Sequence, residues 1–360
     1  MEVVTLMQGS PHSSLTPVFL VHAISGAALP YFQLQSLSDD DRPVYGISSP
    51  IHCANSDGFE FPATLRDLAA IYIQHILTVH AQGPFILGGW SMGGMVAMLM
   101  AQMLHDDGRL VEKVIMIDSA NPELLPSIDS PEQLADIAQG TFERSVAIRG
   151  LQFDHDIKPA SQPLSPLPQD VMLSCHATDT PSPFAWQNPV SWAPTPSSPC
   201  TSFHPDHPSS SPSPAPTSPD PSLASDTTSN ASDTDTCNSS LGSPEGPDDE
   251  PDFLANIKLH IYHGLGLMAR VQPGDLFPPG SSSDFDAILI SCAAPPDLFA
   301  VDPSPYLHSR LVKGDALGWN AARFKTFTRL NFSGLHDAAF EMENIAEISQ
   351  LLRLCLIDLA

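Results

Sequence analysis

A serine with a glycine two positions before it and another two after it occurs in Gly89-Trp90-Ser91-Met92-Gly93. The residues that lead in, FILGG, have the pattern of a buried strand, and MGGMVAMLMAQML, which follows, has that of a helix. A sharp strand-to-helix turn lifts the serine hydroxyl out of the core and aims the free amides of the helix N-terminus at it. A turn needed only for packing is the alternative. The flanking elements favour Ser91 as a nucleophile.

A serine hydroxyl reacts only when a histidine accepts its proton and an acidic group orients that histidine. In strand-turn-helix sites of this kind the chain order is serine, acid, histidine. His336 follows the last predicted strand, on the glycine-containing loop of NFSGLHDAAF just before a terminal helix, and we predict it as the base. The other candidates in the folded regions are less well placed: His105, His155, His260, His263 and His308. Of these, His260 and His263 fall in an amphipathic pattern that indicates lid surface or core.

Two aspartates compete for the role of the acid. Asp118 ends the apolar run KVIMID, and Asp297 follows AILISC in SCAAPPDLF. Both come after the carboxyl end of a predicted strand, where sites of open α/β sheets form. Strand-end geometry alone does not choose between them, and an ordinary loop or cap aspartate is the alternative for either.

Acyl transfer by a serine also requires two backbone amides that stabilise the oxyanion. The amide of Met92, directly after the serine, supplies one. For the second we select the amide of Ile24 in the loop after VFLVHA, with Ala23 as the alternative. His22 precedes the nucleophile in the chain and is better interpreted as structural than as a base.

Short β-rich runs alternate with helical patterns over most of the chain, which predicts one α/β domain with a mostly parallel sheet covered on both faces. Helical patterns occupy 64–80, the stretch after Ser91, and 342–358. The strand pattern stops near Asp118 and resumes near Asp286, so an insertion separates them. The predicted strands are 18–23, 44–49, 85–90, 113–118, 287–292 and 324–332.

The middle of the chain has an unusual composition. Between Lys158 and Lys258 there is no Lys or Arg but a dozen Asp and Glu, among many Pro, Ser and Thr. Such a segment cannot bury enough apolar surface to offset its ordering entropy, so we predict disorder over 178–252. A regulatory or partner-binding linker is one interpretation, and an inert surface insertion or a mis-spliced gene model is the other and the one we favour.

The formal net charge of −26 argues against nucleic acid or an anionic membrane as a partner. The sequence contains no run of about 18 consecutive apolar residues, so we predict no membrane-spanning helix. The first residues lack a basic segment followed by an unbroken apolar run, so we expect no secretory signal and a cytoplasmic location. No cofactor or metal is expected, since the cysteines are scattered without ligand spacing and indicate reduced thiols: Cys53, Cys175, Cys200, Cys237, Cys292 and Cys355.

Taken together, LVHAISG, GGWSMGG, VIMIDSANP and GLHDAAF resemble the thioesterase domains of polyketide and nonribosomal peptide synthases, over most of the chain outside the acidic tract. The resemblance is most specific at GGWSMGG. It implies an α/β-hydrolase fold and an acid about 27 residues after the serine, which is the spacing of Ser91 and Asp118. The acidic, Pro-rich tract is a departure from the family pattern.

The resemblance also implies the organisation and the reaction. A helical lid would be inserted between acid and histidine, which gives core at 1–121, lid at 122–177, the tract at 178–252, lid at 253–282 and core at 283–360. An acyl chain on the phosphopantetheine of an acyl or peptidyl carrier protein would be released by hydrolysis or cyclisation, by an enzyme acting in trans. A general esterase or lipase and a non-catalytic binding protein are the alternatives.

Overall fold

The structure, a computed structural model, describes residues 2–53, 59–125, 127–128, 130–148, 250–292, 314 and 316–357. All described helices and strands belong to one of two units, Met1–Asp154 with Glu245–Ala360. Asp297, the cysteines of the middle segment and nearly all of the predicted tract lie outside the described residues. Among the described helices, none is long and apolar enough to cross a membrane.

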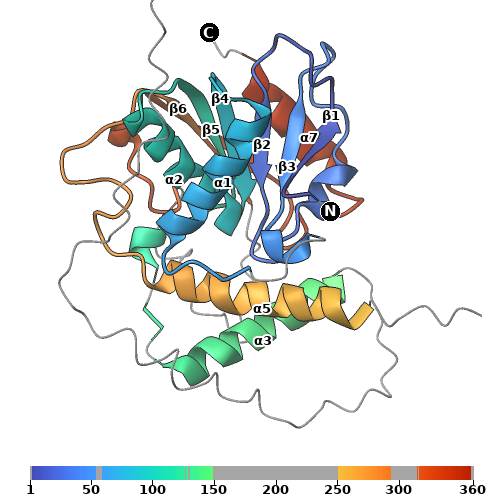
Figure 1. The fold of residues 1–360 in the computed structure, drawn as a ribbon, viewed down its shortest axis with the longest axis vertical. Helices are drawn as coiled ribbons and strands as arrows, with labels where there is room; N and C mark the ends of the chain where they lie inside the picture. The colour runs from blue at the N-terminus through green and yellow to red at the C-terminus, as the bar shows by residue number, and fades with distance from the viewer. Residues whose placement is uncertain are drawn as a thin grey trace, which may run out of the picture. The chain divides into compact units, whose positions relative to one another are not determined.

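Seven strands of the described residues form one sheet, with the order β1-β3-β2-β4-β5-β6-β7 (Figure 1). Only the pairing of β1 with β3 is antiparallel, and the other pairs are parallel. All six predicted strands are present, whereas the half-buried edge strand β1 was not predicted. The strands are β1 (Val4–Gln8), β2 (Val18–Val21), β3 (Val44–Ile47), β4 (Phe85–Trp90), β5 (Val111–Ile117), β6 (Asp286–Cys292) and β7 (Thr326–Phe332).

Alternate side chains of the central strands enter two different cores, as the two-residue period of a strand requires. On β4, Leu87 packs with helices α1 (Leu65–Val79) and α2 (Met92–Asp106), whereas Ile86 packs with α7 (Ile345–Leu356) on the opposite face. A strand buried on both faces has no polar side, which explains the continuous apolar runs. The predicted sheet covered on both faces is confirmed.

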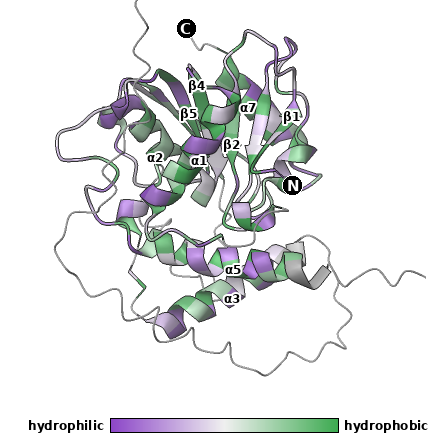
Figure 2. Ribbon diagram, viewed as in Figure 1, coloured by the Kyte–Doolittle hydropathy of each residue, from purple (hydrophilic) through white to green (hydrophobic). Residues whose placement is uncertain are grey.

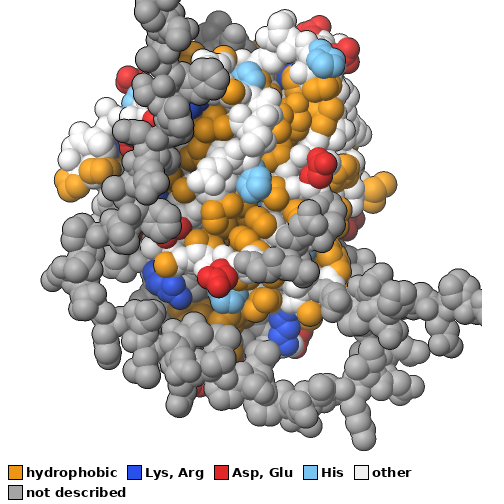
Figure 3. Space-filling model, viewed as in Figure 1, with side chains coloured by type: hydrophobic (Ala, Val, Ile, Leu, Met, Phe, Trp, Pro, Cys, Tyr) orange, Lys and Arg blue, Asp and Glu red, His pale blue; other side chains and the backbone are white. Residues whose placement is uncertain are grey.

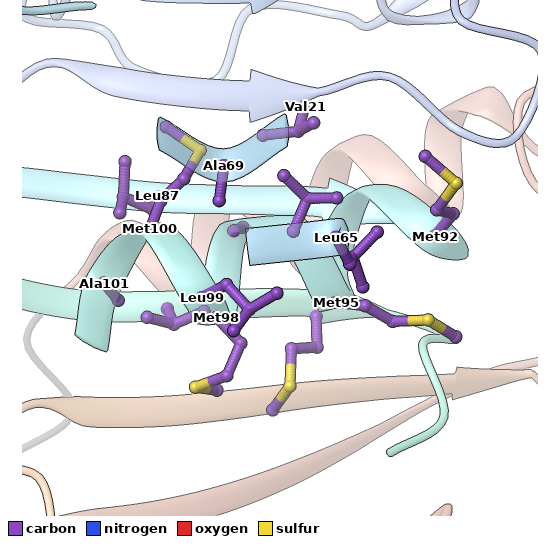
Figure 4. Close-up of a cluster of buried hydrophobic side chains, with 14 of the residues drawn as sticks. Val21, Leu65, Ala69, Leu87, Met92, Met95, Met98, Leu99, Met100 and Ala101 are labelled. Atoms are coloured by element: carbon purple, nitrogen blue, oxygen red, sulfur yellow. The ribbon is translucent and has the colours of Figure 1, made fainter. Parts of the chain in front are cut away.

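Helix α2 is apolar almost all the way round because it is enclosed between the sheet and other helices. Figure 4 shows Met95, Met98 and Met100 of α2 in one cluster with side chains of α1 and of strands β2 and β4. Figure 2 shows that the central strands are mainly hydrophobic, whereas α1 carries both hydrophobic and hydrophilic residues. The rigid core therefore holds the start of α2 in place.

The N-terminus of α1 is set by a reciprocal capping box. The Thr64 side chain accepts from the amide of Asp67, and the Asp67 carboxylate accepts from the Thr64 amide. One face of this helix is buried in the core, and it carries Leu65, Leu68, Ala69, Tyr72, Ile73 and Ile76.

Two helices fall in the predicted lid segments, α3 (Pro131–Ile148) and α5 (Glu250–Ala269), and they pack against each other. Helix α5 begins at Glu250, whereas the second lid segment was predicted from 253. It also contacts α1 and the 3-10 helix η2 (Pro50–His52), and hydrophobic side chains are visible between α1 and α5 in Figure 3. The described residues also form short 3-10 helices at Leu29–Gln33, Pro122–Leu124 and Ala321–Arg323.

Candidate active site

Ser91 occupies a strained turn between the end of β4 and the start of α2. Its backbone angles are φ 58° and ψ −121°, a region that residues with a Cβ rarely adopt. The two flanking glycines are required by close contact. A Cβ on Gly89 would lie 2.4 Å from the carbonyl carbon of Gly93, and a Cβ on Gly93 would lie 2.2 Å from the Val21 oxygen. The sequence therefore lifts one hydroxyl beyond the carboxyl end of β4.

His336 connects this serine to Asp118. Its Nε2 lies 3.1 Å from Ser91 Oγ, and its Nδ1 lies 2.5 Å from Asp118 Oδ2. Because the carboxylate accepts, Nδ1 carries the proton and Nε2 presents a lone pair that accepts the serine hydroxyl. A histidine in this tautomer can act as a general base toward Ser91.

Asp118 is 4 % exposed and is held by the neighbouring strand β6. Its amide donates to the Ile290 carbonyl at 2.7 Å, and its Oδ1 accepts from the Cys292 amide at 3.0 Å. With a φ of 49° the residue turns out of β5 and points its carboxylate at His336. Of the two aspartates that the sequence left open, Asp118 contacts the histidine, and Asp297 is outside the described residues.

The first turn of α2 and the loop after β2 meet beside Ser91. Met92 begins the helix, and the contact of Gly93 with the Val21 carbonyl brings the helix start against that loop. Ala23 and Ile24 line the same pocket as Ser91. The two predicted oxyanion positions, Met92 and Ile24, are thus on the two backbone segments that adjoin the serine, as is the alternative, Ala23.

A pocket extends from the serine toward helices α3 and α5. Arg144 of α3 and Asp337, which follows His336, are charged groups at its wall. The wall also contains apolar side chains, which can bury an apolar ligand. They come from α2, the loop before α3, helix α5 and the segment before β7: Met95, Leu125, Leu265, Met268 and Leu317.

Among the described contacts, none of the other candidate histidines forms a hydrogen bond with Ser91. His105 packs against Phe285 at the far end of α2, and His263 stacks on Phe61 with ring centroids 4.1 Å apart. His155 and His308 lie outside the described residues. Within the described part of the chain, no group of three or more His, Cys, Asp or Glu is arranged to hold a metal ion.

Sequence reasoning missed several neighbours of the serine. Trp90 and Asp337 line the pocket, and both are adjacent in the chain to predicted site residues, so proximity could have indicated them. His260, interpreted as lid surface or core, is 1 % exposed and donates to the Ile24 carbonyl. No local pattern could have indicated that contact, because the two residues are 236 positions apart.

Comparison with known proteins shows to which family the chain belongs. The family model of the thioesterase domain matches residues 16–139, which include Ser91 and Asp118. Thioesterase pytI of Aspergillus terreus is 31% identical over 378 residues, with 100% of both chains covered. The chain belongs to the thioesterase family. The resemblance expected from the sequence is confirmed, and the protein is a thioesterase.

A second relative and a solved structure extend the comparison. The non-reducing polyketide synthase PKS16 of Cladonia grayi is 37% identical over 126 residues, which span 35% of this thioesterase and 6% of the synthase. The NocB thioesterase domain, solved in covalent complex with a fluorophosphonate nocardicin G analog, has a TM-score of 0.54 at 18% identity. That alignment covers 99% of this chain and 100% of the NocB chain, and it confirms the predicted α/β-hydrolase fold.

Proposed function

We propose that this thioesterase releases an acyl chain from the phosphopantetheine thioester of an acyl or peptidyl carrier protein, with Ser91, Asp118 and His336 as its catalytic triad. The hydrogen-bond chain from Ser91 through His336 to Asp118 is the observation on which the proposal rests. Similarity to a segment of a polyketide synthase supports a chain carried by such a synthase as the substrate.

In the first half of the reaction Ser91 Oγ attacks the thioester carbonyl carbon while His336 Nε2 accepts the hydroxyl proton. The carbonyl oxygen becomes an oxyanion that accepts from the amides of Met92 and Ile24. When the tetrahedral intermediate collapses, the C–S bond breaks, and the phosphopantetheine thiolate takes the proton from His336. The products are the free thiol and an acyl ester on Ser91.

In the second half a nucleophile attacks the ester carbonyl, and His336 accepts its proton. Water gives a free acid, whereas a hydroxyl, amine or enol of the chain itself gives a cyclic product. The proton then passes to Ser91 Oγ as the ester C–O bond breaks, which restores the enzyme. Asp118 holds Nδ1 protonated and stabilises the imidazolium that forms in each half.

The proposal assigns the substrate's phosphopantetheine to the partner, so the enzyme needs no cofactor or metal of its own. It places the reaction in the cytoplasm, where the carrier proteins would be. Helices α3 and α5, the described helices of the two proposed lid segments, would enclose the acyl chain.

A fluorophosphonate probe tests the triad directly, because an activated serine displaces its fluoride and keeps the phosphonyl group. We expect one adduct by intact mass on the wild type and none on Ser91→Ala. Asp118→Asn should slow the labelling by about 10³-fold or more, since it removes the group that fixes the histidine tautomer. Asp106→Asn, at the exposed far end of α2, is the matched control and should label like the wild type.

Turnover then distinguishes thioesters from oxygen esters. We expect acyl thioesters of a pantetheine-like thiol to be hydrolysed or cyclised faster than the matching nitrophenyl esters. A preference for the oxygen esters would contradict the carrier-protein proposal and leave a general esterase. Labelling of Ser91→Ala at the wild-type rate would contradict the triad.

A further inference from the structure

Three histidine rings surround the loop that follows β2, and each hydrogen-bonds a successive backbone carbonyl. His22 Nδ1 lies 2.6 Å from Ala23 O, His260 Nδ1 lies 2.9 Å from Ile24 O, and His52 Nε2 lies 3.0 Å from Ser25 O. A carbonyl oxygen only accepts, so each of these ring nitrogens carries its proton. We call the three rings the histidine cradle; they come from the loop itself, from α5 and from η2.

The cradle is closely packed and neutral. The rings of His22 and His260 meet edge to face with centroids 4.8 Å apart, and a Cβ on Gly26 would lie 2.6 Å from the His260 ring. Burial lowers the pKa of all three histidines, that of His22 to about 4. The Tyr72 hydroxyl donates a hydrogen bond to His22 Nε2 at 2.5 Å, which agrees with the tautomer that the Ala23 carbonyl requires.

The peptide between Ala23 and Ile24 is the part of the loop that matters for the oxyanion. In a planar trans peptide the carbonyl of one residue and the amide N–H of the next point in opposite directions. A hydrogen bond that fixes the Ala23 carbonyl therefore also fixes the direction of the Ile24 amide. The hydrogen bond from His260 to the Ile24 carbonyl fixes the next peptide, so Ile24 is held at both its amide and its carbonyl.

Helix α5 touches both oxyanion positions with one face. Gly264 lies one turn after His260, and a Cβ there would lie 2.7 Å from Ile24 Cδ1 and 2.9 Å from Met92 Sδ. The absence of a side chain at 264 lets the helix approach the two residues whose amides the mechanism uses. His260 and Gly264 thus form a contact face of α5 on the oxyanion site.

We propose that His260 is a positioning residue that couples the seating of lid helix α5 to the assembly of the oxyanion hole. This inference rests on the proposed function, because it assigns the Ile24 amide to the oxyanion. With α5 seated, the imidazole holds Ile24 and the His22 ring, and the Ile24 amide is aimed at the reacting carbonyl. With α5 displaced, the loop loses this donor and the amide is no longer held.

The matched variants at position 260 distinguish the effect of the N–H donor from the effect of the size of the ring. His260→Asn keeps an N–H donor near the Nδ1 position, whereas His260→Gln carries its donor farther out and His260→Leu has none. His263→Leu is the control on the same helix, since His263 stacks on Phe61 and is absent from the pocket wall. Each variant is assayed for kcat and KM on an acyl pantetheine thioester, for the rate of fluorophosphonate labelling, and for Tm.

We expect His260→Leu and His260→Gln to lower kcat and the labelling rate by about tenfold or more, since losing an oxyanion donor outright costs about 10²–10³-fold. KM should stay within about threefold, and His260→Asn and His263→Leu should stay near the wild-type kcat. Should His260→Leu fail to fold, the difference in kcat between His260→Asn and His260→Gln tests the inference instead.

Equal kcat in all four variants would overturn the inference, and so would a loss confined to KM or Tm. Failure of His260→Asn to restore kcat would also overturn it, since the donor would then not be the reason for the effect. The proposed function fails by a different result, the absence of any adduct on wild-type Ser91. The two failures are therefore distinguishable.

Discussion

At the scale of single residues, the site depends on backbone conformations that ordinary residues avoid. Ser91 and Asp118 both have positive φ, of 58° and 49°. Each stands where a parallel strand ends, and each is held by a hydrogen bond from its amide to a neighbouring strand, Ser91 to Ile117 and Asp118 to Ile290. The stability of the sheet thus maintains a local strain that places the hydroxyl and the carboxylate.

Replacement of Ser91, the proposed nucleophile, should reveal this strain. We expect Ser91→Gly to be more stable than Ser91→Ala by about 1 kcal/mol, because glycine accepts the positive φ that alanine resists. Both variants lack the serine hydroxyl, so the comparison isolates the effect of the backbone conformation on stability. Urea unfolding of the two variants measures it, and a Ser91→Gly protein less stable than Ser91→Ala would show that the turn is not strained.

At the scale of elements, close approach between α2 and its neighbours decides where the proposed catalytic groups meet. The helix begins against the loop after β2, since Gly93 has no side chain to separate them. A Cβ on Gly94 would similarly lie 2.1 Å from Ser119 Oγ, one residue after Asp118. Glycines at the start of α2 therefore bring Ser91, the loop after β2 and the end of β5 close together.

Two glycine-to-alanine substitutions in helices test this interpretation. Gly93→Ala should lower stability by several kcal/mol and displace the loop after β2, because its Cβ would overlap backbone atoms of Val21 and His22. Gly140→Ala in α3 is the control, since its Cβ would meet only Arg144 Nη1 at 3.5 Å, and it should gain up to about 1 kcal/mol. Thermal unfolding and activity assays measure both, and a stable, active Gly93→Ala enzyme would contradict the packing argument.

At the scale of the molecule, the neutral, buried histidine cradle links stability to pH. Burial lowers the pKa of His22 from 6.5 to about 4, and it also lowers the pKa of His260 and of His52. Well above pH 6.5 these histidines are neutral in both the folded and the unfolded chain. As the pH falls toward 4, the unfolded chain binds protons that the folded protein does not, so folding is disfavoured.

For His22 alone this linkage lowers the free energy of unfolding by about 2 kcal/mol between pH 7 and pH 5. His22→Asn keeps a donor for the Ala23 carbonyl and does not titrate, so its stability should fall less over that interval. Urea unfolding of both proteins at the two pH values gives the difference. Equal losses in the two would show that His22 is not held neutral in the folded state.

The sequence alone determined the features that arise from local periodicity and turn chemistry. The strands buried on both faces are continuous apolar runs, the Ser91 turn is marked by its glycines, and His336 follows the last strand just before the terminal helix. Edge strand β1 was missed because a half-buried edge needs no strong apolar pattern.

Only the tertiary structure decided which distant groups meet. Strand-end position admitted both Asp118 and Asp297, and the contact with His336 is a relation across 218 positions of chain. The same holds for His260, whose helical pattern indicated burial but not that its ring would reach the Ile24 carbonyl. Periodicity reports which face of an element is buried, whereas the partner of a buried polar group depends on how elements far apart in the chain pack together.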